Sequence, residues 1–152
     1  MRFLVKHTGQ AEQRLLKYVA DEYSFDIEPI VHIINFDVIV NKLNLTVVND
    51  NKVAQVWGFC PYTNWIKSNC NVPQYTEGLL IVMDNLESGF SYGINSDDEW
   101  PVYVNQKTGW ICVGNPERSG EAVEFMNNCV AVVDNNNKLV SLWLKPQELP
   151  LI

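Results

Sequence analysis

The spacing of apolar and polar residues changes from a helical period to a strand period near residue 30. Apolar residues before that point recur at the spacing of one helix face: Leu15, Leu16, Val19 and Tyr23. Charged residues take the opposite side, so the pattern predicts an amphipathic helix over residues 10–23. Thr8 is a suitable N-cap for this helix, and Pro29 ends the connection that follows it.

Beyond this point the pattern is typical of β-strands. Apolar and polar residues alternate over 36–40 and again over 43–47, which predicts two half-buried strands. An Asn-Asp-Asn turn at 49–51 then leads into residues 53–57, and together these segments predict a β-hairpin.

Three further segments complete the predicted sheet. The continuous apolar run at 78–84 predicts a strand that is buried on both faces. Residues 101–113 predict a hairpin in which Gly109 supplies the positive φ of the turn. Residues 129–144 predict a second hairpin, and its strands are apolar on both faces. We therefore expect this hairpin at the centre of the sheet, with the helix covering one side.

These elements predict one domain spanning residues 1–152 with an α+β fold. In this fold an N-terminal helix packs on a mainly antiparallel β-sheet of about seven to nine strands. A chain of this length buries roughly 70% of its unfolded surface, enough for a core without disulfides or metals. No apolar run is long enough for a transmembrane helix or a signal peptide, so we expect a cytoplasmic protein with free thiols and no membrane contact.

One motif resembles that of a serine nucleophile. Residues 89–93 read Gly-Phe-Ser-Tyr-Gly and match the Gly-x-Ser-x-Gly turn of hydrolases. That turn needs a helix behind Ser91 and a later histidine, but residues 94–101 do not favour a helix. Both histidines, His7 and His32, precede the motif. We therefore expect a glycine-rich turn without catalytic activity, and we expect His32, in an apolar run, to be a hydrogen-bonded core residue.

The cysteines give no metal-ligand spacing, so the sequence predicts no metal and no cofactor. Cys60 enters an irregular loop that Cys70 closes, and three interpretations are open. Cys60 is a partly buried inert thiol, forms a disulfide with Cys70, or acts as a nucleophile with His32. The inert thiol is favoured, because only Lys67 is available nearby to lower the thiol pKa.

Charge and aromatic residues give the strongest indications of function. The net charge is −7, and no Lys/Arg-rich surface is readable, so we expect no nucleic-acid partner. Residues 68–106 contain no Lys or Arg but carry six carboxylates: Glu77, Asp84, Glu87, Asp97, Asp98 and Glu99. This stretch is either ordinary solvated surface or a docking face for a basic partner. A weak cation site at 97–99 is a less favoured alternative.

Aromatic residues are concentrated in the predicted loops of the same region: Tyr62, Trp65, Tyr75, Phe90, Tyr92 and Trp100. They are satellite core packed under the loops, anchors of a protein interface, or the walls of a small-ligand or sugar site.

Together these features predict a non-catalytic cytoplasmic protein that binds a basic protein partner through an acidic, aromatic-rich surface. The residues expected to bind are Trp65, Tyr92, Asp97, Asp98, Glu99 and Trp100. Small acidic inhibitors of basic nucleases, such as the immunity proteins of toxin systems, have this kind of composition. The alternative is a small-molecule-binding protein or an enzyme, with a cleft formed by loops 58–77 and 85–100.

Overall fold

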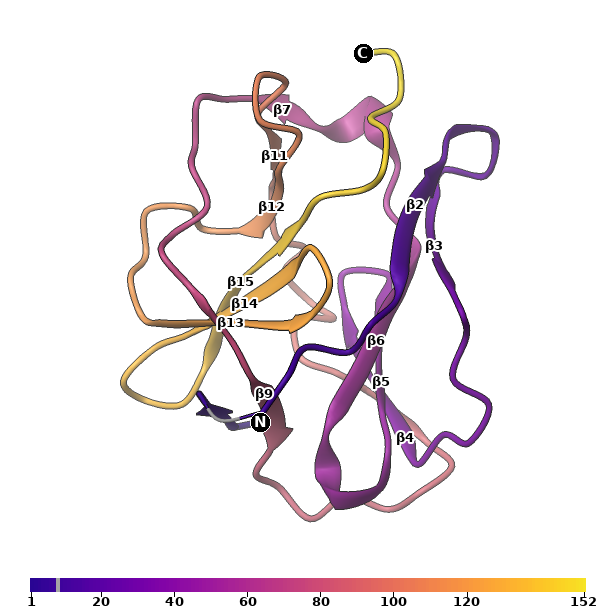
Figure 1. Cartoon of the computed structure of the whole chain (residues 1–152), viewed down its shortest axis with the longest axis vertical. Coiled ribbons are helices and arrows are strands. Elements are labelled where there is room, and N and C mark those ends of the chain that lie inside the picture. The colour runs from indigo at the N-terminus through magenta and orange to yellow at the C-terminus, as the bar shows by residue number, and fades with distance from the viewer. Residues whose placement is uncertain (8) are drawn as a thin grey trace.

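Two large β-sheets face each other and form a sandwich (Figure 1). The computed structural model describes residues 1–7 and 9–152. This part of the chain contains fifteen strands and three short 3-10 turns: η1 (Ala20–Glu22), η2 (Asn49–Asn51) and η3 (Tyr62–Asn64). None of the described helical segments is long and apolar enough to cross a membrane.

The first layer is a six-stranded sheet. Its strands, in spatial order, are β10 (Ser91–Gly93), β4 (Phe36–Val40), β5 (Leu43–Val47), β6 (Val53–Phe59), β3 (Ser24–Glu28) and β2 (Leu15–Val19). Neighbouring strands are antiparallel except at one edge, where β10 runs parallel to β4.

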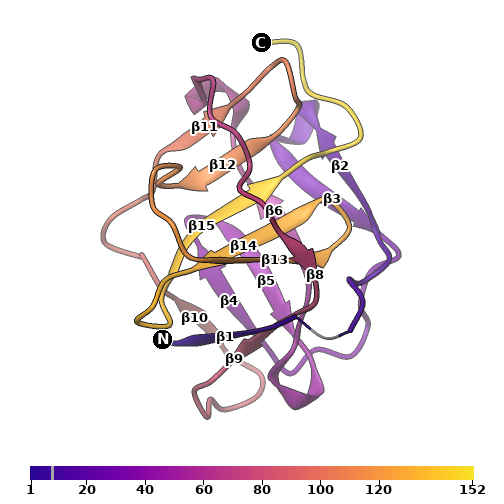
Figure 2. The same ribbon diagram turned by 60° about the vertical axis from the view of Figure 1, so that its left-hand side comes forward.

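The second layer has seven strands. In spatial order they are β7 (Ile66–Lys67), β11 (Val102–Val104), β12 (Ile111–Gly114), β15 (Leu139–Leu144), β14 (Cys129–Val133), β13 (Glu121–Met126) and β8 (Thr76–Glu77). The short edge strands β7 and β8 run parallel to their neighbours. A separate two-stranded ribbon, β1 (Phe3–Lys6) with β9 (Leu79–Val82), lies at one end of the sandwich (Figure 2).

The main core lies between the two large sheets, and a smaller core covers the outer face of the seven-stranded sheet. Every residue of β14 and β15 is buried, because the strands are apolar on both sides. On the outer side, Trp110 and Trp143 pack with Cys70 and Val72 of the long segment that precedes β8. The predicted central position of this hairpin is therefore confirmed, but a loop covers its outer face instead of a helix.

The helix predicted over 10–23 is wrong, and with it the α+β class. Leu15–Val19 form β2, which pairs along its length with β3 after a tight turn in which Tyr23 has a φ of 56°. Leu16 is buried and Tyr18 packs edge-on against a core phenylalanine, so alternate residues face inward. As a strand, this segment satisfies its main-chain hydrogen bonds by pairing with β3. Thr8, the predicted cap, lies outside the described residues.

The strand that follows, β3, was missed although its signal is present. Phe25 and Ile27 are buried and alternate with polar residues that face outward. This alternation is the strand period, but it is too short to outweigh the preceding helical spacing. The count of seven to nine strands is also too low, because several edge strands have only two or three residues.

The other predicted strands are found with small corrections. The three hairpins appear as β5–β6, β11–β12 and β14–β15, and Gly109 has the expected positive φ, 85°. The apolar run at 78–84 forms β9, but only Leu80 and Val82 are buried, so burial on both faces is wrong for this strand. His32 is exposed in an irregular segment and is not a core residue.

The central hairpin should be the most sensitive part of the core. Leu142 of β15 is fully buried, so Leu142→Ala removes buried methyl groups and leaves a cavity. We expect a loss of about 2–5 kcal/mol in the free energy of unfolding, measured by denaturant melts. The matched control is Leu15→Ala, because Leu15 is 40% exposed, and its loss should stay below about 1 kcal/mol. Equal losses in the two variants would contradict this account of the core.

Candidate functional site

The three adjacent carboxylates lie on the loop that joins β10 to β11. We call residues 95–100 the acidic loop. Asp97, Asp98 and Glu99 are all exposed, and a turn hydrogen bond from the Asp98 N–H to the Asn95 carbonyl, 3.1 Å, shapes the loop. None of the ion pairs in the described part of the chain includes these three carboxylates. Within the described residues these carboxylates therefore form no direct ion pair, although the cation of Lys42 lines the same pocket as Glu99.

A single asparagine holds the two ends of the acidic loop. Asn41 lies in the two-residue turn between β4 and β5 and has a φ of 56°, which asparagine tolerates better than most residues. Its side-chain oxygen accepts the main-chain N–H of Trp100 at 2.8 Å and the amide of Asn95 at 2.6 Å. Its side-chain nitrogen donates to the Trp100 carbonyl at 3.0 Å, and its main-chain N–H donates to the Asn95 side chain at 2.8 Å. These four bonds fix the loop against the sheet.

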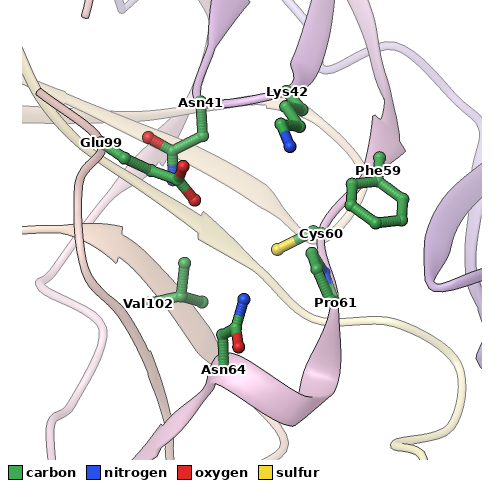
Figure 3. Close-up of a pocket in the computed structure, with 8 residues that line it drawn as sticks. All are labelled: Asn41, Lys42, Phe59, Cys60, Pro61, Asn64, Glu99 and Val102. Carbon is green, nitrogen blue, oxygen red and sulfur yellow. The ribbon is translucent and has the colours of Figure 1, made fainter. Parts of the chain in front are cut away.

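A small pocket lies beside this asparagine, at one end of the sandwich (Figure 3). Its volume is about 170 Å³, and it is lined partly by residues that follow β6 and partly by Glu99. Figure 3 shows the amine of Lys42, the sulfur of Cys60 and the amide of Asn64 directed toward the cavity. The Lys42 amine also lies 5.4 Å from the centre of the Phe59 ring, a cation–π contact.

The thiol of Cys60, which lines this pocket, has the properties of an unreactive, structural cysteine. Cys60 is buried, and both Cys60 and Cys70 are free, which does not support the disulfide alternative. Burial raises the pKa of the Cys60 thiol to about 11, and the carboxylate of Glu99 acts in the same direction. The indole N–H of Trp65 opposes this shift only in part. The thiol therefore stays protonated near neutral pH, as the inert interpretation requires.

The predicted aromatic residues are placed differently from one another. Trp65 is only 7% exposed, stacks on Phe25 at 6.2 Å and meets Tyr18 edge-on at 4.9 Å, so it belongs to the core. Apart from its effect on the Cys60 thiol, its buried indole nitrogen has no hydrogen-bond partner in the described part of the chain. Tyr92 and Trp100 are half-buried and pack against the core. Tyr92 lies in β10, and Trp100 is the last residue of the acidic loop.

The six carboxylates of residues 68–106 do not all belong to the acidic loop. Glu77 is in β8, the edge strand of the other sheet, and Asp84 accepts the main-chain N–H of Arg2 at 2.6 Å. The structure brings together Asp97, Asp98 and Glu99 only. It adds Asn41 and Lys42, which the sequence analysis missed, although a polar pair between two alternating apolar segments is a recognisable hairpin turn.

The Gly-x-Ser-x-Gly motif has no nucleophile geometry. Ser91 begins the edge strand β10, and in the described residues its hydroxyl has no hydrogen bond to a histidine or a carboxylate. His7 instead bonds Thr76 and Glu121, at 2.7 and 3.0 Å. Over the described ranges 1–7 and 9–152, no group of three His, Cys, Asp or Glu residues could hold a metal ion.

The Asn41 clamp can be tested without disturbing the backbone. Asn41→Gly keeps the positive φ but removes the three side-chain bonds to the acidic loop. We expect a loss of about 1–3 kcal/mol in stability and faster hydrogen exchange at the Trp100 amide. Asn128→Gly is the matched control, because Asn128 has a φ of 62° and its side chain makes none of the described hydrogen bonds. The same exchange rate at Trp100 in both variants would show that the clamp does not order the loop.

Ser91 should behave as an ordinary serine. A fluorophosphonate probe reacts with serines that a neighbouring base activates, and Ser91 has no such partner among the described side chains. We expect mass spectrometry to find no adduct at Ser91 under conditions that label a serine hydrolase fully. Stoichiometric labelling of Ser91 would establish a catalytic role.

Comparison with known proteins gives no independent assignment. No protein-family model matches the chain, and no curated protein sequence matches it. The acidic loop, its clamp and the neighbouring pocket are therefore the features that bear on function.

Proposed function

We propose that this protein is a non-catalytic binding protein whose acidic loop binds a basic protein partner. The observation that carries the proposal is the combination of three exposed, adjacent carboxylates with a clamp that holds the loop in one conformation. A charged loop that is ordered before binding loses less conformational entropy when a partner docks. The clamp is therefore useful for binding, whereas a purely solvated loop would not need it.

The charges of the acidic loop favour binding of a basic partner and do not stabilise the folded protein. Three neighbouring carboxylates repel one another, and no basic side chain of the described chain forms an ion pair with them. A basic surface brought against the loop would relieve this repulsion and would be attracted before contact. Trp100, half-buried at the end of the loop, offers an aromatic anchor beside the carboxylates.

The small-molecule alternative has less support. The pocket beside the loop holds about 170 Å³, whereas ligand pockets usually span about 300–1,000 Å³. A groove of about 530 Å³ beside β10 is large enough, but no described residue of the loop 58–77 lines it. Burial raises the pKa of the Cys60 thiol that lines the smaller pocket, which disfavours the reactive thiolate. Asn41 and Glu99, which line the smaller pocket, also belong to the acidic loop and its clamp, so a partner docked on the loop would cover this pocket.

We place this binding function in the cytoplasm. All four cysteines are free, and a reducing compartment keeps thiols in that state. An acidic protein that covers the basic surface of an enzyme would act as an inhibitor, as in the class of immunity proteins named above.

Neutralising the loop should slow association with the basic partner. We expect the triple variant Asp97→Asn, Asp98→Asn, Glu99→Gln to associate about tenfold or more slowly at low ionic strength. Its dissociation rate should stay nearly unchanged, and its association rate should depend less on salt. The partner is first captured from a lysate of the native host and purified, and the rates are then measured by surface plasmon resonance.

The control changes the same number of charges elsewhere. Asp21→Asn, Glu22→Gln, Asp26→Asn alters the net charge equally, and all three residues are exposed beside the β2–β3 turn. This variant should keep most of the association rate. An equal reduction in both variants would show that only net charge matters, and no reduction in the loop variant would contradict the proposed function.

A further inference from the structure

The edge strand β10 leaves main-chain groups free for a further strand. β10 is the last strand of the six-stranded sheet and runs beside β4 (Figure 2). Asp37 of β4 donates its N–H to the Phe90 carbonyl at 3.2 Å, and Ile94 donates its N–H to the Ile39 carbonyl at 3.1 Å. In a parallel ladder these bonds direct the main-chain groups of residues 90, 92 and 94 toward β4. The N–H and carbonyl groups of Ser91 and Gly93 therefore point away from the sheet.

In the described part of the chain, Ser91 and Gly93 line a groove beside this edge. The groove, about 530 Å³, lies between β10 and the chain at Met1 and residues 84–86. Met1, Leu86 and Ile94 are partly buried and give it an apolar floor, while Ser91 and Asp84 form its polar side. The opposite edge of the same sheet differs, because there the Gln147 N–H donates to the Leu16 carbonyl of β2 at 2.9 Å.

The charge around the groove selects the occupant. Asp84 is the one carboxylate that lines the groove, and four more stand in the sequence on either side of β10, with no Lys or Arg among residues 84–99: Glu87, Asp97, Asp98 and Glu99. Arg2, whose main-chain N–H bonds Asp84, is outnumbered by this set. Two copies of this edge would bring like charges together, so the charge disfavours pairing between copies. A basic segment would be attracted from both ends of β10.

We propose that an extended, basic segment of another protein adds to the six-stranded sheet as a new strand beside β10. Ser91 and Gly93 supply two donors and two acceptors to its main chain, and the groove takes its apolar side chains. Basic side chains on the alternate positions approach the carboxylates that flank β10. This inference rests on the proposed function for the charge of the partner, and it adds the site and the conformation of the bound segment.

The test uses defined peptides instead of an unknown partner. The probe is a short synthetic peptide of alternating lysine and valine, titrated into the isotope-labelled protein and followed by NMR. We expect chemical-shift changes centred on residues 91–94 and slower hydrogen exchange at the Ser91 and Gly93 amides. A glutamate–valine peptide of equal length, and a lysine–valine peptide N-methylated at alternate residues, should both bind at least about tenfold more weakly.

Two substitutions at one position separate the main chain from the side chain. Ser91→Pro removes the outward N–H without removing a bond to β4, and proline is accepted at the first residue of an edge strand. We expect it to weaken peptide binding at least about tenfold. Ser91→Ala removes the hydroxyl but keeps the N–H, so binding should be retained. The N-methylated peptide gives the same information without altering the protein, should Ser91→Pro loosen β10.

The outcomes distinguish this inference from the proposed function. Loss of binding in Ser91→Pro and with the N-methylated peptide, but not in Ser91→Ala, supports strand addition. Equal binding of the N-methylated and unmodified peptides would overturn it, even if neutralising residues 97–99 still slows the basic protein partner. A dimer that Ser91→Pro dissociates would assign the edge to a second copy and would also overturn it.

Discussion

The burial of the β14–β15 hairpin on both faces is the constraint on which the rest of the structure depends. One face is covered by the six-stranded sheet, which creates the main core. The other face needs its own cover, and the segment before β8 supplies it, with Cys70 and Val72 on the tryptophans and Tyr75 at 6.2 Å from Trp110. Much of the long region at 58–77 is therefore occupied by packing, whereas the carboxylates at 97–99 stay exposed.

The acidic loop also depends on the sheet. Its clamp residue lies in a turn whose position is fixed by the register of β4 and β5, where Val40 pairs with Leu43. Because both strands are held in the core, the turn places the Asn41 amide within hydrogen-bond distance of Asn95 and Trp100. The core thus defines the positions of carboxylates that themselves contribute nothing to it.

The sequence predicts the structure correctly where the residue types of a segment alone determine its burial or its turn. The strands at 129–133 and 139–144 are apolar except for Ser141, so their central position could be predicted, and Gly109 indicated its turn. The prediction failed at Leu15–Val19, where adjacent leucines imitated a helical face and only pairing with β3 decides the structure. The carboxylates at 97–99 could be found from composition. The turn at Asn41 was recognisable, but its role as a clamp could not be predicted, because its partners lie more than fifty residues away.

The order of strands has a consequence for how the protein reaches this structure. β1 pairs with β9, β4 with β10 and β8 with β13, so several ladders join segments that are far apart in the chain. Each such ladder requires the intervening chain to close into a loop before its hydrogen bonds form. Topologies of this kind fold in milliseconds to seconds, more slowly than helical bundles of similar stability. Until these ladders form, their strands are unpaired, so nascent chains of this protein stay open to aggregation for longer than the native surface suggests.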